Sequence, residues 1–252
     1  MSHTPDMTQA ESATIGSGPT KRRTRRSPTL QEKPSVGVDV VIFTVIDSDL
    51  KVLLAKREGQ PFKGVWSLPG GLVRVRNSGD QGEGIEQAAH RELSEATGLT
   101  PGSCFVEQLY TFGKAGRDPR GRVISVAWIA LVSPDQGRAI HPGDQGDAQW
   151  FSTHEEIPWM RLAFDHAEIL DTAVERIRGK LDHSNIAFEL VPETFTVAEL
   201  RDTYEAIKSR TYDARNFRRR FQRMIGEGVV TEAPGKRHRG KARPAKIWRL
   251  QR

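Results

Sequence analysis

The residues best suited to chemistry are acidic side chains in and before the stretch HRELSEATGL, residues 90–99. Glu92 and Glu95 are three positions apart, so they share one face of a helix. Glu83 precedes them, with seven residues between it and Arg91. Hard divalent cations bind several carboxylate oxygens that converge on one point, and a bound cation can activate water for hydrolysis. The sequence therefore predicts Glu92 and Glu95 as metal ligands at a catalytic position.

One position weakens this metal site. A carboxylate at position 96 would stand four residues after Glu92 on the same helix face and complete the cluster, but the residue there is Ala96. Loss of a direct ligand should cost at least the roughly 10 to 100-fold in metal affinity or activity that outer-shell changes cost. We therefore expect Mg²⁺ binding to be weakened and the catalytic role of Glu92 and Glu95 to be vestigial. Ala96→Glu should then raise turnover.

Cationic and aromatic residues near this stretch are suited to an anionic ligand with a base. Arg57 ends an expected strand and Arg74 follows the segment GVWSLPGGL, so both are candidate phosphate partners. Trp66 is a candidate for stacking on a base, although core packing explains it equally well. The expected ligand-binding residues are Arg57, Trp66, Gly70, Gly71, Arg74, Arg91 and Arg117.

These residues must be positioned by strands and helices, and the apolar patterns predict a mixed sheet with helices packed against it. Expected strands span residues 36–46, 51–57, 105–112, 122–132 and 148–151. The segment 64–72 is expected to be a loop, and residues 85–97 a helix that Gly98 closes. A further helix is expected over residues 162–181, with Asp165 placed to cap its start.

The C-terminal part of the chain differs in charge from the middle. Residues 27–183 carry 17 basic and 22 acidic side chains, whereas residues 184–252 carry 16 basic and 8 acidic ones. Such a division is typical of a ligand-binding domain joined to a domain that binds a polyanion. Thr196 and Glu199 form a capping box before one amphipathic helix, and Asp213 precedes a second.

The second of these helices, YDARNFRRRFQRMIGEG, has one apolar face and an opposite face of guanidinium and amide groups. Arginine reads guanine, and Asn and Gln read adenine, so this face is suited to DNA bases and phosphates. The segment GVVTEAPGKRHRGKARPAKIWRL then predicts two strands joined by a basic loop, which is a wing. An RNA-binding or acidic-partner module is the alternative. The expected DNA-binding residues are Arg215, Asn216, Arg218, Arg219, Gln222, Arg223, Lys236, Arg237, Arg239, Lys241 and Arg243.

The spacing of PGG, Glu83 and RELSEATGL resembles the Nudix box, whose proteins cleave nucleoside diphosphate derivatives, and the resemblance covers roughly residues 35–160. It implies that Arg91 orients the carboxylates and that Glu83 braces the loop or adds a ligand. Ala96 departs from the pattern, and so do six extra residues between Gly71 and Glu83. The segment RDPRGR, residues 117–122, resembles Nudix domains that act on ADP-ribose; a surface turn is the other explanation of its arginines, and we expect it to hold for at least one of them.

The combination of a Nudix box, LAFDHAEIL and YDARNFRRRF resembles bacterial Nudix-related transcriptional regulators of NAD metabolism. It implies an α+β fold, with a Nudix-type mixed sheet followed by a small winged helix-turn-helix domain, and a homodimer that binds operator DNA and senses ADP-ribose. The expected function is repression of NAD biosynthesis genes. The alternative is an active ADP-ribose pyrophosphatase with a nucleic-acid-binding tail, in which Glu107 or Asp118 replaces the missing ligand.

Composition is consistent with this organisation. The chain has 252 residues, a net charge of +6 and one cysteine, Cys104, so no disulfide can form within it. No apolar run reaches the roughly 18 residues of a membrane span, and we expect a cytoplasmic protein located at the bacterial nucleoid. The expected divisions are a disordered basic tail (1–34), a Nudix-like domain (35–160), a connecting helix (161–183) and a winged helix domain (184–252).

Overall fold

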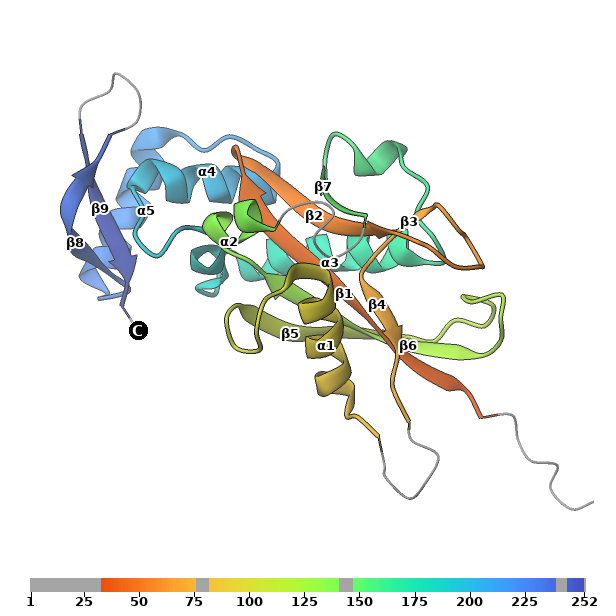
Figure 1. The fold of residues 1–252 in the computed structure, drawn as a ribbon. Coiled ribbons are helices and arrows are strands. Elements are labelled where there is room, and N and C mark those ends of the chain that lie inside the picture. The colour runs from red at the N-terminus through yellow and green to blue at the C-terminus, as the bar shows by residue number, and fades with distance from the viewer. Residues whose placement is uncertain (1–32, 76–81, 141–146, 239–243, 252) are drawn as a thin grey trace, which may run out of the picture. The chain divides into compact units, whose positions relative to one another are not determined.

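A seven-stranded mixed sheet forms the first part of the fold (Figure 1). The computed structural model describes residues 33–75, 82–140, 147–238 and 244–251. The strands are β1 (Ser35–Ile46), β2 (Asp49–Lys56), β3 (Trp66–Ser67), β4 (Gly70–Leu72), β5 (Phe105–Phe112), β6 (Val123–Leu131) and β7 (Ala148–Ser152). β1 is central: it pairs in parallel with β6 and antiparallel with β2 and β4. β5 pairs with β6, and β3 and β7 pair with β2.

The two faces of the sheet pack against different helices. Alternate residues of β1 enter different apolar clusters: Val41 and Phe43 join one, and Val40 and Ile42 join the other. This explains why β1 is a continuous apolar run rather than an alternation of apolar and polar residues. In Figure 1, α1 (Ile85–Thr97) lies on one side of the sheet and α3 (His166–Lys180) on the other.

A winged helix follows the sheet. Its elements are α4 (Val197–Lys208), α5 (Ala214–Gly226), β8 (Val230–Arg237) and β9 (Ala245–Leu250). β8 and β9 pair antiparallel and form the wing. The predicted capping box is confirmed, since Thr196 Oγ1 accepts from Glu199 N and Glu199 Oε2 accepts from Thr196 N. The predicted cap at Asp213 is also confirmed, because its Oδ1 accepts from Asn216 N at 2.9 Å.

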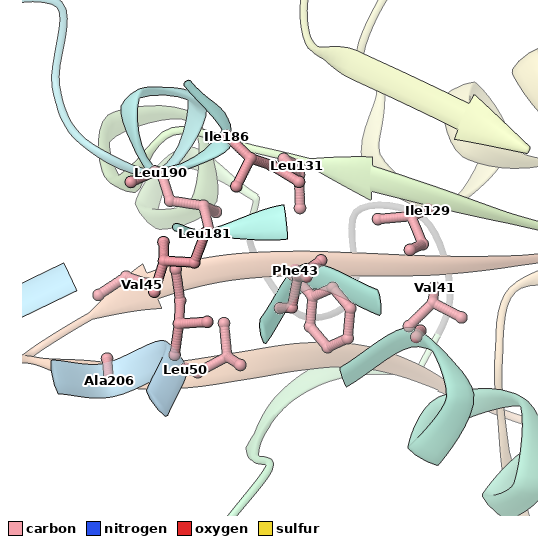
Figure 2. Packing of buried hydrophobic residues seen from close by; sticks show 14 of the residues in the cluster. Val41, Phe43, Val45, Leu50, Ile129, Leu131, Leu181, Ile186, Leu190 and Ala206 are labelled. Carbon is pink, nitrogen blue, oxygen red and sulfur yellow. The ribbon is translucent and has the colours of Figure 1, made fainter. Parts of the chain in front are cut away.

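One apolar cluster runs from the sheet into the winged helix. It contains Phe43 of β1, Ile177 of α3 and Ile207 of α4, and it continues to Phe217 of α5. Figure 2 shows its central part, where Leu181, Ile186, Leu190 and Ala206 meet the strand residues. The winged helix is therefore packed on the sheet rather than tethered by a free linker, and the residues from Pro34 onward form one compact unit.

Several elements differ from those that the sequence predicts. The segment 64–72 is not simply a loop, because it contributes β3 and β4. The helix expected over residues 162–181 begins at His166, and Leu162 before it forms a bridge to Trp66. Three short helices were not predicted: α2 (Pro134–Ala139), η1 (Ile157–Trp159) and η2 (Ile186–Leu190). In the described part of the chain, no helix has the length and apolar character to cross a membrane.

Candidate functional site

The carboxylates of the Nudix-like stretch surround the Arg91 side chain. Arg91 Nε and Nη2 donate to the two oxygens of Glu83 at 2.9 and 2.7 Å. Arg91 Nη1 donates to Glu92 Oε1 at 2.6 Å and to Glu95 Oε2 at 3.4 Å. Helix α1 supplies three of these four residues, and Glu83 lies just before it. The guanidinium therefore holds all three predicted metal ligands in one group.

The pKa values of two of these carboxyl groups are shifted in opposite directions. The hydrogen bonds from Arg91 lower the pKa of Glu83 to about 2. Burial raises the pKa of Glu92, whose side chain is only 13% exposed, although Arg91 opposes this. Glu92 therefore takes up a proton more readily than Glu83 does.

A second arginine engages the same group from the loop before α1. Arg74 Nη2 donates to Glu95 Oε1 at 3.0 Å, and Arg74 N donates to Glu83 Oε1 at 2.8 Å. Arg74 is a predicted phosphate partner, and in the structure its side chain is paired with the Glu95 carboxylate.

The carboxylates as they stand do not fit a divalent cation. Among the residues that the structure describes, no group of three or more His, Cys, Asp or Glu side chains is arranged to hold one. Ala96 lies in the apolar cluster beneath α1 and is 9% exposed, so position 96 offers no oxygen. Glu107, considered as a replacement ligand, instead pairs with Arg176 and Lys180 of α3. Asp118, the other replacement, pairs with Arg120 at 2.6 Å.

Gly70 and Gly71 allow a close approach of neighbouring groups. A Cβ atom at Gly70 would lie 2.4 Å from the carbonyl oxygen of Val38, with which it could not coexist. A Cβ atom at Gly71 would lie 2.3 Å from Glu92 Oε1. Because these glycines have no side chain, β4 packs directly against β1 and the Glu92 carboxylate lies close to the backbone of β4.

Next to β4 lies a cavity of about 130 Å³. Its lining includes Gly70, Gly71, Arg57, Arg117, Asp118, Arg120 and Phe164. The Arg57 and Arg120 guanidinium carbons lie 4.6 and 5.5 Å from the centroid of the Phe164 ring. Burial and the charge of Arg120 lower the pKa of Arg57. Ligand pockets commonly measure about 300 to 1,000 Å³, so this cavity has room for one part of a nucleotide.

Arg117, predicted as a ligand-binding residue, is a buried part of the frame of this cavity. Its side chain is 5% exposed, and its Nη2 lies 3.2 Å from Asp39 Oδ2 and 2.6 Å from Asp165 Oδ1. Asp165 is the N-terminal residue before α3, as predicted, but its carboxylate forms no cap there and binds Arg117 instead. Asp39 and Asp165 therefore orient the Arg117 guanidinium.

The sequence reasoning missed the partners of Arg117 as site residues. Asp39 accepts from Ser125 Oγ at 2.5 Å and lies 3.3 Å from His166 Nε2. His166 Nδ1 in turn accepts from Leu68 N at 2.9 Å. The available signal was Asp39 itself, an acidic residue inside an otherwise apolar strand. Burial opposes ionisation of Asp39, but His166, Ser125 and Arg117 lower its pKa to about 2.

Trp66 lies against the core. Its ring makes an edge contact with Phe151, with centroids 4.8 Å apart, and Lys56 Nζ lies 5.9 Å from its ring. Trp66 is not among the residues that line the cavity. The geometry therefore matches core packing, the alternative left open by the sequence, and stacking on a base stays a prediction.

Helix α5 presents the predicted cationic face. Phe217 and Phe221 of the same helix are buried. The predicted contact residues on the outer face are all exposed: Arg215, Asn216, Arg218, Arg219, Gln222 and Arg223. Asn216 Oδ1 accepts from Arg219 Nη2 at 2.7 Å, which orients one of these arginines.

The wing is only partly within the described residues. Lys236 is exposed. Arg237 differs from it, because its Nη1 donates to both carboxylate oxygens of Glu199 at 3.0 and 2.9 Å. Arg239, Lys241 and Arg243 lie outside the described residues.

Ion pairs and hydrogen bonds attach α4 and α5 to α3 and the segment after it. Asp182 Oδ2 binds Lys208 of α4 at 2.8 Å, and its Oδ1 binds Arg220 of α5 at 3.1 Å. Hydrogen bonds from Lys208 and Arg220 lower the pKa of Asp182. Arg178 of α3 donates to Ile207 O at 3.0 Å and so satisfies a carbonyl at the end of α4.

Comparison with known proteins matches both parts of this geometry. A model of the NUDIX domain matches residues 36–173, and a model of the NrtR DNA-binding winged helix domain matches residues 187–250. The chain is 35% identical over 219 residues to the ADPR responsive transcriptional repressor NtrR of Acinetobacter baylyi, over 86% of this chain and 82% of that protein. The chain belongs to the NrtR family. The expected family and the expected fold, a Nudix sheet followed by a winged helix, are thereby confirmed.

Solved structures agree with this assignment. This NrtR family member superimposes on Shewanella oneidensis NrtR complexed with a 27mer DNA with a TM-score of 0.73 and 33% identity, over 86% of this chain and 93% of that one. A MutT/nudix family protein from Enterococcus faecalis gives a TM-score of 0.67 at 29% identity, over 88% and 90% of the two chains. An ADP-ribose pyrophosphatase of Methanocaldococcus jannaschii is 37% identical over 150 residues, 60% of this chain and 79% of that protein.

Proposed function

We propose that this chain is a transcriptional repressor that binds operator DNA through α5 and the wing and senses ADP-ribose or a related nucleotide through its Nudix domain. The observation that carries the proposal is the presence of an exposed arginine helix and a Nudix-type site in one chain, in which α5 packs in the same apolar cluster as α3. Its relatives include a repressor described as ADPR responsive and an NrtR complexed with DNA. The proposed targets are NAD biosynthesis genes, which would place the protein at the nucleoid.

DNA binding rests on the outer face of α5. Six of its residues are exposed cations or amides, and Asp213 at the start of the helix is engaged in capping it. Arg and Lys side chains supply phosphate contacts, and Arg, Asn and Gln supply base contacts in the major groove. Operators with twofold symmetry match dimeric winged helices, so we propose a homodimer, which light scattering of the purified protein would test.

Nucleotide binding rests on the cavity beside β4 and on the arginines around it. Arg57 and Arg120 flank Phe164, and they can offer guanidinium groups to a phosphate. Arg91 and Arg74 lie on the other side of Gly71, where they hold the carboxylates of α1. Because these carboxylates do not fit a cation as arranged, no part of the proposal depends on a bound metal. The buried Arg117 side chain lies in the lining of the cavity and is held by Asp39 and Asp165.

Helix α3 connects the two sites. Asp165 and His166 at its start contact the frame of the cavity, and Arg178 near its end contacts α4. A nucleotide that binds one position of α3 better than another shifts the equilibrium between them, and α4 and α5 move with it. ADP-ribose would thereby weaken operator binding.

The test is fluorescence anisotropy of a labelled duplex from the promoter of an NAD biosynthesis operon, with and without ADP-ribose. We expect tight binding that falls steeply with salt and is weakened by ADP-ribose about 5 to 150-fold, the usual range of allosteric coupling. A scrambled duplex of the same length is the control. Equal affinity for both duplexes would refute sequence-specific repression, and an unchanged affinity with ADP-ribose would refute the effector.

A second candidate is hydrolysis of ADP-ribose. Glu83, Glu92 and Glu95 favour it, as does the likeness to an ADP-ribose pyrophosphatase. Ala96 weighs against it, because its methyl group is packed in the apolar cluster. AMP release from ADP-ribose with Mg²⁺ or Mn²⁺ separates the candidates: turnover of about 1 s⁻¹ or more would identify an ordinary enzyme.

A further inference from the structure

Arg237 is the last residue of β8, and its guanidinium faces the protein. Arg237 Nη1 lies 3.0 and 2.9 Å from the two oxygens of Glu199, and Nη2 donates to Thr194 Oγ1 at 3.2 Å. The Arg237 side chain is 34% exposed and the Glu199 side chain 29%. By contrast, the preceding residue, Lys236, is exposed.

Glu199 has two functions at the start of α4. Its Oε2 accepts from Thr196 N at 2.7 Å, which completes the capping box, and the same carboxylate binds Arg237. The chain just before the cap is also joined to the wing, since Phe195 and Trp248 exchange two backbone hydrogen bonds of 2.8 and 2.7 Å. The Phe195–Trp248 pair attaches β9 to this segment, and Arg237 attaches β8 to it.

We propose that Arg237 is a positioning residue of the wing and not a DNA contact. Its ion pair with Glu199 fixes the end of β8 against the first turn of α4, and so sets the direction of the strands β8 and β9 relative to α5. A phosphate that recruited Arg237 would have to break a charge-assisted pair and leave Glu199 without its cation beside the DNA. This inference rests on the proposed DNA-binding function.

The substitution Glu199→Gln tests the positioning role, because the two explanations predict opposite changes in DNA affinity. Glutamine retains the capping box, because Gln accepts from the same backbone N–H, but it loses the charge that holds Arg237. Removal of a negative charge near DNA should by itself tighten binding. If the pair positions the wing, binding should instead weaken, by about 2 to 5-fold for a partly exposed ion pair worth up to about 1 kcal/mol.

Salt dependence supplies the second readout. A residue that contacts a phosphate contributes about 0.9 to the slope of the logarithm of affinity against the logarithm of salt concentration. Lys236→Gln, the matched neighbour, should lower the slope by that amount. Arg237→Gln and Glu199→Gln should weaken binding without changing the slope, and the double variant should be no weaker than either single one, because both remove the same pair.

Hydrogen exchange of the full-length protein without DNA keeps the inference separate from the proposed function. Loss of the pair should speed exchange of the amides of β8 and β9 in both the Glu199→Gln and Arg237→Gln variants but not in Lys236→Gln. Unchanged exchange in the first two variants, or tighter and more salt-dependent DNA binding by Glu199→Gln, would overturn the positioning role. If wild-type protein bound no duplex at all, the proposed function would fail while the exchange result would still decide this one.

Discussion

The substitution Asp39→Asn probes whether the buried network around Arg117 is ionised, as the geometry indicates. Asp39 is 7% exposed and contacts Arg117, Ser125 and His166. Asparagine has nearly the same shape, but it replaces one carboxylate oxygen with an NH2 donor, so the variant removes the charge and one of the two acceptors that face Arg117, Ser125 and His166. Arg117 keeps Asp165 as its remaining carboxylate partner.

The magnitude follows from the pKa. Burial raises the pKa of Asp39, but its polar partners prevail and lower it from 3.8 to about 2. One pKa unit corresponds to about 1.4 kcal/mol, so the ionised carboxylate contributes about 2 kcal/mol to the free energy of unfolding. Because the folded pKa is depressed, this contribution is fully present above about pH 5 and is lost as the pH falls toward 2. About half of it is gone near pH 3.

The assay is urea unfolding followed by tryptophan fluorescence from pH 7 to pH 3. We expect Asp39→Asn to be about 2 kcal/mol less stable than wild type at pH 7, with the difference shrinking below pH 4. Asp171→Asn, on the exposed face of α3, is the matched control and should change stability by less than about 0.5 kcal/mol. A stability difference that is absent at pH 7, or that does not shrink in acid, would contradict an ionised network.

Three further outcomes test the remaining surfaces. Arg219→Gln should weaken operator binding at least about 10-fold, as measured by anisotropy on matched and mutated duplexes. If Arg219 contacts a phosphate, the slope of the logarithm of affinity against the logarithm of salt concentration should fall by about 0.9. If it contacts a base, the free-energy difference between the two duplexes should fall by about 1 to 3 kcal/mol. Ala96→Glu should lower the free energy of unfolding by about 1 to 3 kcal/mol, because a carboxylate replaces a buried methyl group, and Mg²⁺ should restore stability only if the carboxylates then bind it. In thermal unfolding, Gly70→Ala should lower the Tm far more than Gly71→Ala, since the new methyl group meets a fixed carbonyl in the first and the movable end of Glu92 in the second. Equal Tm values for the two glycine variants would argue against the close packing of β4.

Local signals predicted most of the regular elements. The helix 85–97 and the strand 105–112 have the predicted bounds. Gly98 ends the helix in the left-handed conformation with φ 72°, which glycine adopts without strain. These features depend on residues close together in the chain, so a single sequence contains enough information to place them.

Elements that depend on distant partners were not predictable in this way. β3 and β4 are two and three residues long, and they are strands only because β2 and β1 lie beside them. The carboxylate partners of Arg117, Asp39 and Asp165, lie 78 and 48 positions away from it, so the sequence does not show these contacts. Glu199 lies 38 positions before Arg237, so their ion pair was not predictable from the sequence either. An arginine side chain looks the same in sequence whether it binds a ligand or a carboxylate of the protein.

Helix α3 gives the proposed response to a nucleotide a physical basis. It has 15 residues and therefore extends about 22 Å, with Asp165 and His166 at the cavity and Arg178 at the end of α4. Because its inner face is packed in the same apolar cluster as the sheet, a small rotation at the cavity should shift the residues packed along its length. Coupling of this kind is reciprocal: if ADP-ribose weakens operator binding by a given factor, operator DNA must weaken ADP-ribose binding by the same factor. A binding titration of ADP-ribose to the DNA complex thus measures the same coupling free energy as the displacement of DNA, and an ADP-ribose affinity that is the same with and without operator DNA would refute coupling between the two sites.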